Sequence, residues 1–202
     1  MKQDYLPLLP EHHYHLLGRA IGKEKLFRND ENFRFFLERM EKYLLPVAEI
    51  YSYCLLPDHF HLLTRIRPSL AIEIHYAQMK KGLVAAAIDL PDFIMERFSN
   101  LLNSYSKSYN KMYARRGSLF MDYLKRKQMP PGSVADTICL IHNNPVKHRY
   151  CQHPADWKWS SYQDFLHPGA AQLAIREALS YFNGKGSFTA RHEWPLQWEL
   201  PE

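Results

Sequence analysis

Apolar residues near the start of the chain follow two periods, one typical of strands and one typical of helices. Residues 12–21 alternate loosely and end at Gly22, which predicts a strand. After the N-cap candidate Asn29, apolar side chains recur every three or four residues until Pro46. That spacing predicts an amphipathic helix that the proline stops.

The middle of the chain predicts a β-hairpin followed by helices. Residues 48–56 and 59–66 are rich in β-forming side chains and flank the turn residue Pro57, so they predict two paired strands. Residues 71–91 are weakly patterned, and we expect a helix followed by a loop. Residues 92–113 carry a long apolar stripe at helical spacing, which predicts a strong helix.

The last third of the chain predicts one more strand and short helices. Residues 118–129 predict a strand that carries a run of basic side chains. Ser133 is a plausible N-cap for a short helix through about His142, which Pro145 closes. A further helix is expected over about 170–182, followed by a tail rich in Trp and Pro.

The order of these elements, β-α-β-β-α-β-α, predicts an α+β fold. Strands separated by helices, with one direct hairpin, favour a ferredoxin-like antiparallel sheet with helices packed on one face. A C-terminal helical extension would follow. We therefore divide the chain into a domain over 1–165 and a C-terminal helix and tail over 166–202. This fold hosts many functions and does not select one.

Composition is that of an ordinary globular protein, with 46% hydrophobic and 23% charged residues. The three cysteines, Cys54, Cys139 and Cys151, have no paired spacing, which argues against a disulfide scaffold or a zinc ribbon. No apolar run approaches the roughly 20 residues that span a bilayer. The chain is therefore expected to be cytoplasmic, without a membrane partner.

The net charge of +5 is concentrated in one segment. Residues 97–128 contain eight basic residues and one acid, so the rest of the chain is slightly acidic. Such a segment attracts polyanions by releasing counterions, although a solvated basic face would have the same composition. The candidates for contact with nucleic acid are Lys107, Lys111, Arg115, Arg116, Lys125, Arg126 and Lys127.

Two histidines alternate on the second strand of the predicted hairpin. Side chains alternate faces along a strand, so His59 and His61 point the same way, about 7 Å apart, and Phe60 points opposite. Two imidazoles at this spacing can hold one divalent metal, although two partly exposed histidines would show the same pattern. Two ligands are too few for a closed structural zinc site, which favours an open, catalytic-type site.

Five motifs in order resemble the REP-associated tyrosine transposases and their insertion-sequence relatives, the single-tyrosine HUH-type family. The first is YCLLPDHFHLL, which contains His59 and His61. It is followed by NSYSKSYN, RRGSLF, IHNNPVKH and WKWSSY. The resemblance spans roughly residues 14–162, and the collinear order makes it much stronger than any single motif.

The resemblance implies a metal site and a nucleophile on the last helix of the domain. In the family, an Asn or Gln four residues after the nucleophilic tyrosine completes the metal site, which implies His59, His61 and Asn144 as ligands of Mg²⁺ or Mn²⁺. The tyrosine forms a 5′-phosphotyrosine with single-stranded DNA chosen by a nearby hairpin. In this chain Leu140 occupies the tyrosine position, and leucine cannot be a nucleophile.

Other residues could replace the missing tyrosine, and the sequence leaves this open. Cys139 is about 100° round the helix from the required face. Tyr123 lies on the basic strand and is a weak alternative, and Tyr150 follows the helix. Tyr105, Tyr109 and Tyr113 recur at four-residue spacing, which favours core packing over stacking on bases. His13 and His15 alternate on the first strand, and we expect a surface role for them over the alternative that they approach the site.

Three functions follow from these residues. The first is a transposase-like protein that binds single-stranded or hairpin DNA, has a vestigial or retained divalent-metal site and is impaired in strand cleavage. The second is an active metal-dependent DNA strand transferase with a non-standard nucleophile. The third is a metal-dependent hydrolase of small phosphoesters, which the two histidines alone would permit. Insertion-sequence relatives act as dimers and REP-associated relatives need not, so a homodimer stays open.

Overall fold

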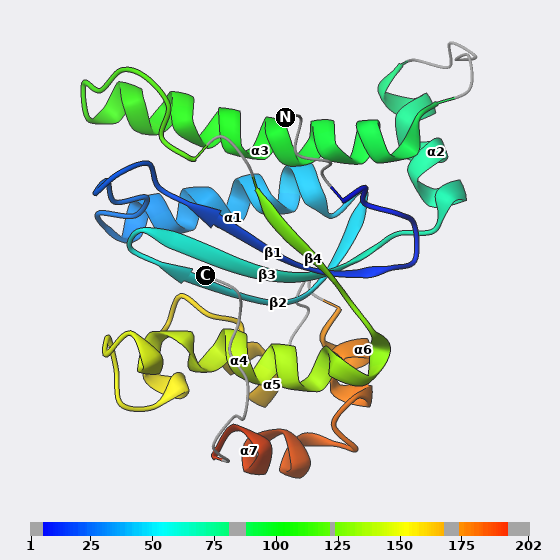
Figure 1. Cartoon of the computed structure of the whole chain (residues 1–202), viewed down its shortest axis with the longest axis vertical. Coiled ribbons are helices and arrows are strands. Elements are labelled where there is room, and N and C mark those ends of the chain that lie inside the picture. The colour runs from blue at the N-terminus through cyan, green and yellow to red at the C-terminus, as the bar shows by residue number, and fades with distance from the viewer. Residues whose placement is uncertain (1–5, 81–87, 122–123, 168–173, 194–202) are drawn as a thin grey trace.

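An antiparallel sheet of four strands lies in the middle of the protein, with helices on both of its faces (Figure 1). This computed structural model describes residues 6–80, 88–121, 124–167 and 174–193. The strands are β1 (His13–Arg19), β2 (Ala48–Leu56), β3 (His59–Ile66) and β4 (Lys125–Met129), in the order β2-β3-β1-β4. The α+β fold with an antiparallel sheet is confirmed.

The predicted hairpin has the bounds that its sequence suggested. β2 and β3 pair from Leu56 opposite His59 to Ala48 opposite Ile66, with a bulge between Ile50 and Ser52. The outer edge of β2 is covered by the WKWSSY segment. Cys54 forms an isolated bridge with Ser160, and the Trp157 indole donates to the carbonyl of Leu55. Covering this edge removes unpaired backbone groups from solvent.

One face of the sheet packs against α1 (Asp30–Leu44) and α3 (Leu90–Met112). The expected cap is present, since the Asn29 side chain accepts from the Asn32 amide. α2 (Ser69–Met79) precedes α3, as expected. The core on this face is aromatic, and it includes Tyr14, Phe36, Phe60, Phe98 and Tyr105.

The other face packs against α4 (Val134–Lys147) and the helices that follow it (Figure 1). These are α5 (Tyr162–Leu166), α6 (Ile175–Ser180) and α7 (Lys185–Glu193), with 3-10 turns at Pro131–Ser133 and Pro154–Asp156. The expectation that helices cover one face only is therefore wrong. The second face of β2 and β3 is itself apolar, with Tyr51, Cys54 and Leu63, and needs its own cover.

The C-terminal residues that the structure describes belong to this second core. Ile175, Phe182 and Phe188 pack in the same cluster as Ile138 of α4. The division of the chain at residue 165 stays a prediction, and the Trp-rich tail lies outside the described residues. Within the described ranges, no helix is both long and apolar enough to cross a membrane.

Helix α4 continues past the proline that we expected to end it. Pro145 lies inside the helix, which runs to Lys147. The helix ends where Arg149 takes the left-handed conformation, at φ 61°, and the amide of Tyr150 donates to the carbonyl of Pro145. This is a Schellman-type end, which satisfies a carbonyl of the last turn. The proline costs one backbone hydrogen bond, and tertiary packing maintains the helix.

A buried chain of polar groups joins α7 to α4 and the sheet. His192 Nδ1 donates to the carbonyl of Phe188, and its Nε2 is 3.0 Å from His142 Nδ1. His142 Nε2 is 2.8 Å from Ser161 Oγ, which accepts from the amide of Tyr53. Since a carbonyl only accepts, the pattern that satisfies every group keeps both imidazoles neutral. The network is a polar clamp within an apolar core.

A glycine lets β1 approach the aromatic core. Gly18 is opposite Phe60 in the register of β1 and β3, and the phenyl ring lies over the glycine. A Cβ atom at residue 18 would stand less than 3.0 Å from ring carbons of Phe60. The ring also packs on Phe36, with centroids 4.9 Å apart. Phe60 is therefore held on the α1 side, which turns its two neighbours to the α4 side.

Gly18→Ala is expected to destabilise the protein by about 1–3 kcal/mol, because the added methyl overpacks the core. Urea denaturation of the variant and the wild type measures this difference. The double variant Gly18→Ala with Phe60→Leu should recover part of the loss, since the two sites share one contact. Equal stability of Gly18→Ala and wild type would show that the ring moves aside at no cost.

Acid is expected to destabilise the protein through its buried histidines. Burial lowers the pKa of His192 to about 4, from an ordinary value near 6.5. Between these values the unfolded chain binds a proton that the folded chain does not, so stability falls as the pH falls. Urea midpoints measured between about pH 7 and 5 should decrease. His192→Gln should lessen this slope, and an exposed control, His12→Gln, should not.

Candidate metal and nucleic-acid site

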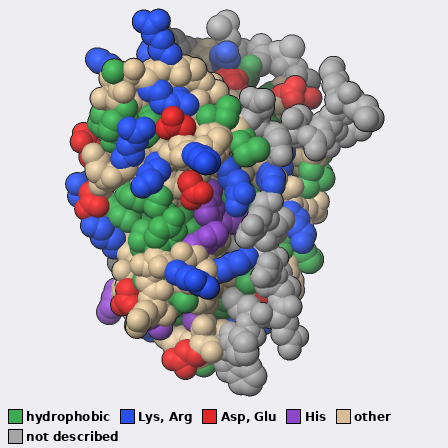
Figure 2. Space-filling view, turned by 60° about the vertical axis from the view of Figure 1, so that its left-hand side comes forward, with side chains coloured by type: hydrophobic (Ala, Val, Ile, Leu, Met, Phe, Trp, Pro, Cys, Tyr) green, Lys and Arg blue, Asp and Glu red, His purple; other side chains and the backbone are tan. Residues whose placement is uncertain are grey.

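The two histidines of β3 lie together on the α4 side of the sheet. Their side chains are buried, with exposed fractions of 2% for His59 and 3% for His61. The ring centroids are 5.2 Å apart, with the rings nearly perpendicular. Figure 2 shows histidine side chains that reach the surface on this side of the molecule, with Lys and Arg side chains around them. The two histidine side chains lie on the same side of the sheet, as strand alternation predicted.

The hydrogen bond of His59 leaves one ring nitrogen for a ligand. Its Nδ1 donates to Asp58 Oδ1 over 2.8 Å, so Nε2 is the nitrogen with a lone pair. Nε2 is buried and has no hydrogen-bond partner among the described residues. Metal-binding histidines commonly donate their other nitrogen to a carboxylate, which fixes the ring and raises its basicity. In this protein Asp58 is the carboxylate that accepts from His59.

Asn144 is buried on the helix that packs over β2 and β3. Its side chain is 5% exposed, and Oδ1 has no hydrogen-bond partner in the described part of the chain. Four residues later, at the end of the helix, lies His148, and its ring centroid is 5.0 Å from that of His59. The last turns of α4 therefore lie beside the histidine pair. An amide oxygen and an imidazole nitrogen, both buried without partners, are suitable donors for a divalent cation.

His15 is a further member of the site, and the expected surface role of His13 and His15 is wrong. His15 Nε2 is 2.8 Å from His61 Nδ1, and both rings are buried and stacked. His13 is also buried and packs edge-on against Tyr51. The alternation of histidines on the first strand was the available signal. What the sequence lacked was the register that brings β1 beside β3.

Burial keeps His15 and His61 neutral at ordinary pH by lowering the pKa of each. Burial, and next the charge of Lys127, lowers the pKa of His15 to about 4. Burial, together with the neighbouring histidines, lowers the pKa of His61 well below its usual value. Neutral imidazole is the form that binds metals. If Nδ1 of His61 donates to His15, its Nε2 is the ligand nitrogen, as in His59.

The donor set fits an open metal site and not a closed one. Over the ranges that the structure describes, no three His, Cys, Asp or Glu side chains are grouped so as to hold a metal ion. The set implied by the resemblance has two imidazoles and one amide, and Asn144 is its third member. Three protein ligands of this kind leave coordination positions for water or a phosphate oxygen.

The nucleophile position on α4 holds a packing residue. Leu140 is partly buried and packs against the second core. Its neighbour Cys139 is fully buried, and burial raises the pKa of its thiol to about 12, so it is not a nucleophile. Tyr123 lies outside the described residues. Tyr150 is 45% exposed, and its ring is 6.5 Å from that of His148.

The basic residues of the sequence are divided between the two faces of the sheet. Lys125 and Lys127 pair with Leu17 and His15, so they share the face of the histidines. Arg126 points the other way, to Met95 of α3. Lys107 and Lys111 are exposed on α3, on that same far side. The structure therefore brings two of the seven candidates to the histidine face.

Arg115 and Arg116 lie in the loop after α3. The Arg115 guanidinium donates to the carbonyl of Ser118 and pairs with Glu24, 3.2 Å away. Arg115 therefore stabilises the loop that contains it and links this loop to the segment before α1. Arg116 is exposed. These contacts give Arg115 a structural role in addition to any contact with phosphate.

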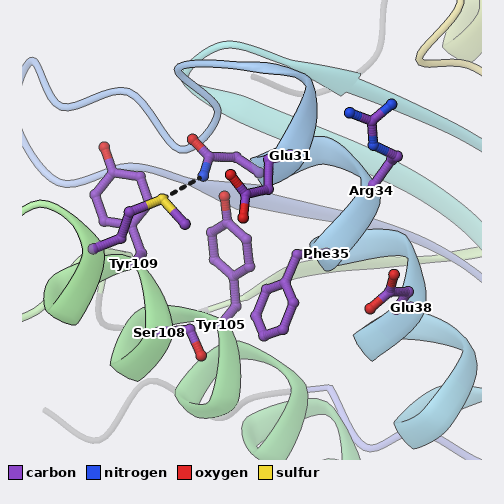
Figure 3. Close-up of a pocket in the computed structure, with 9 residues that line it drawn as sticks. Glu31, Arg34, Phe35, Glu38, Tyr105, Ser108 and Tyr109 are labelled. Carbon is purple, nitrogen blue, oxygen red and sulfur yellow. Dashed lines mark hydrogen bonds between the residues drawn. The ribbon is translucent and has the colours of Figure 1, made fainter.

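The tyrosine stripe of α3 belongs to the core, as expected. Tyr105 and Tyr109 are buried, and their hydroxyls donate to the carbonyls of Leu26 and Lys25. Tyr113 donates to the Asn32 side chain. A cavity of about 360 Å³ lies beside this stripe, between α1 and α3 (Figure 3). It lies across the sheet from the histidines, and its lining includes Glu31, Arg34, Phe35 and Glu38.

Comparison with known proteins identifies a similar fold. No protein-family model matches the chain, and no curated protein matches it. A solved structure of a REP-associated tyrosine transposase bound to a REP hairpin is similar to this chain. The match covers all of this chain and 93% of the transposase chain. The TM-score is 0.60 and the sequence identity 11%. The protein therefore has the fold of that transposase, which the sequence motifs had suggested.

Proposed function

We propose that this protein is a transposase-like DNA-binding protein that recognises single-stranded or hairpin DNA and does not cleave it. The observation that carries the proposal is the placement of His59 and His61 on the sheet face that also carries Lys125 and Lys127, under the helix that carries Asn144. A phosphodiester needs a cation for its charge and donors for its oxygens, and this face offers both. The similar transposase fold supports the same assignment.

The chain's own residues would each have a defined part. His59, His61 and Asn144 would hold Mg²⁺ or Mn²⁺, which when bound polarises a phosphate oxygen. Asp58 holds the His59 ring, and His15 holds the His61 ring. Lys127 and Lys125 would bind neighbouring phosphates. Leu140 supplies no hydroxyl at the family's nucleophile position, so a bound strand would stay intact.

Metal binding is expected to depend on these residues. Calorimetric titration of the full chain with Mn²⁺ should show one site, and His59→Ala or Asn144→Ala should weaken it at least tenfold. Asp58→Ala should weaken it by about 10–100-fold, because the His59 ring loses the carboxylate that orients it. His12→Ala, an exposed histidine, is the control. Unchanged affinity in all three site variants would exclude this metal site.

Leu140→Tyr is expected to restore strand cleavage. The added phenol would attack phosphorus, forming a phosphotyrosine bond as the bond to the 3′-oxygen breaks, and its proton would pass to that oxygen. Single-stranded hairpin DNA with Mn²⁺ should give a covalent adduct on a denaturing gel with this variant and none with the wild type. Leu140→Phe has the same ring without the hydroxyl and should give none.

A second function is favoured by one observation. Tyr150 is exposed, and its ring is close to that of His148, which lies beside His59. A strand transferase that uses Tyr150 would form the adduct without any substitution at Leu140. An adduct of the wild-type chain that Tyr150→Phe abolishes would establish this function. It would overturn the non-cleaving one.

A further inference from the structure

An arginine that no sequence motif singled out lies next to the histidine pair. Arg19 is the last residue of β1 and is directly opposite His59 on β3. Paired residues of an antiparallel sheet share a face, with Cβ atoms about 5 Å apart. The Arg19 charge acts on both Asp58 and His61. The guanidinium is therefore within electrostatic reach of the proposed metal ligands.

The guanidinium of Arg19 has no close partner among the residues that the structure describes. Its Nε is buried and has no hydrogen-bond partner within the described ranges, and no ion pair of Arg19 is formed there. Asp58, whose pKa the charge of Arg19 helps to lower, already accepts a hydrogen bond from His59. A buried donor without a partner costs stability, so an anion that accepts from this guanidinium would be favoured.

Two arginines at the other end of β3 have ion-pair partners. Arg65 of β3 pairs with Glu11 and Glu49. Arg67, which follows β3, pairs with Glu49 and donates to the carbonyl of Leu45. Arg19 differs from both, and it is the one of the three that is paired directly with His59 in the sheet. This contrast favours an external ligand over a structural role for Arg19.

Arg19 also extends the row of basic residues on the histidine face of the sheet. Lys127 and Lys125 lie on β4, beside β1 and on the same face, and Arg19 follows them toward His59. Successive same-face positions on a strand are about 7 Å apart. A nucleic-acid strand that contacts the β4 lysines would therefore bring a phosphate to the guanidinium. A planar guanidinium fork matches two phosphate oxygens.

We propose that Arg19 binds the DNA phosphate next to His59 and His61 and positions it at the metal site. The proposal rests on the proposed function, since it assumes that this face receives DNA. It makes Arg19 a positioning residue, and its phosphate contact does not require the metal. Its ligand is a phosphodiester of a single strand, with no base recognised.

The test is the salt dependence of binding to a fluorescent thymidine oligonucleotide, measured by anisotropy in EDTA. Arg19→Met keeps the aliphatic stem and removes the charge. It should weaken binding roughly tenfold near 50 mM salt and reduce the slope of log K against log salt by about 0.7, the value of one single-strand phosphate contact. Arg19→Lys should retain the slope, because it retains the charge.

Arg34→Met is the matched control. Arg34 is exposed on α1, across the sheet, and its loss changes the net charge equally. It should leave the slope unchanged. A slope that is equal in wild type and Arg19→Met, with both folded by thermal denaturation, would overturn the role of Arg19 alone. Failure of the wild type to bind the oligonucleotide would instead overturn the proposed function.

Discussion

The packing of Phe60 against Gly18 is the constraint on which the site depends. The ring is held on the α1 side because β1 has no side chain at the contact. Strand geometry then turns His59 and His61 to the opposite side, where α4 covers them. A change in register of one residue would exchange the two sides and bury a phenyl ring among the polar groups.

The second face of the sheet combines apolar packing with polar groups that remain unsatisfied. Near α7, the polar groups of His192, His142 and Ser161 satisfy one another completely. Around the histidine pair, His59 Nε2, Asn144 Oδ1 and Arg19 Nε are buried without partners in the described chain. Buried polar groups are normally satisfied, and these three come together around one pair of histidines, which favours a ligand there. A cation and a phosphate would satisfy all three.

The site and its covering helix are linked through one element. α4 carries Asn144, Leu140 and His142, so a single helix carries the proposed metal donor, the leucine at the position where the resemblance implies a tyrosine, and the polar link to α7. Because Pro145 lies inside the helix, its last turn reaches His148 beside His59. The C-terminal helices therefore help to determine the position of the site, although they contribute no ligand to it.

The sequence by itself determined the local features: the hairpin bounds, the Asn29 cap, the tyrosine stripe and the common face of His59 and His61. These depend on periods of two and 3.6 residues within one segment. Only the tertiary structure decided that His15 and Arg19 join the histidines, that the basic segment divides between two faces, and that α4 continues through Pro145. The register between distant strands, and the burial that outweighs local propensity, arise only when the whole sheet has formed.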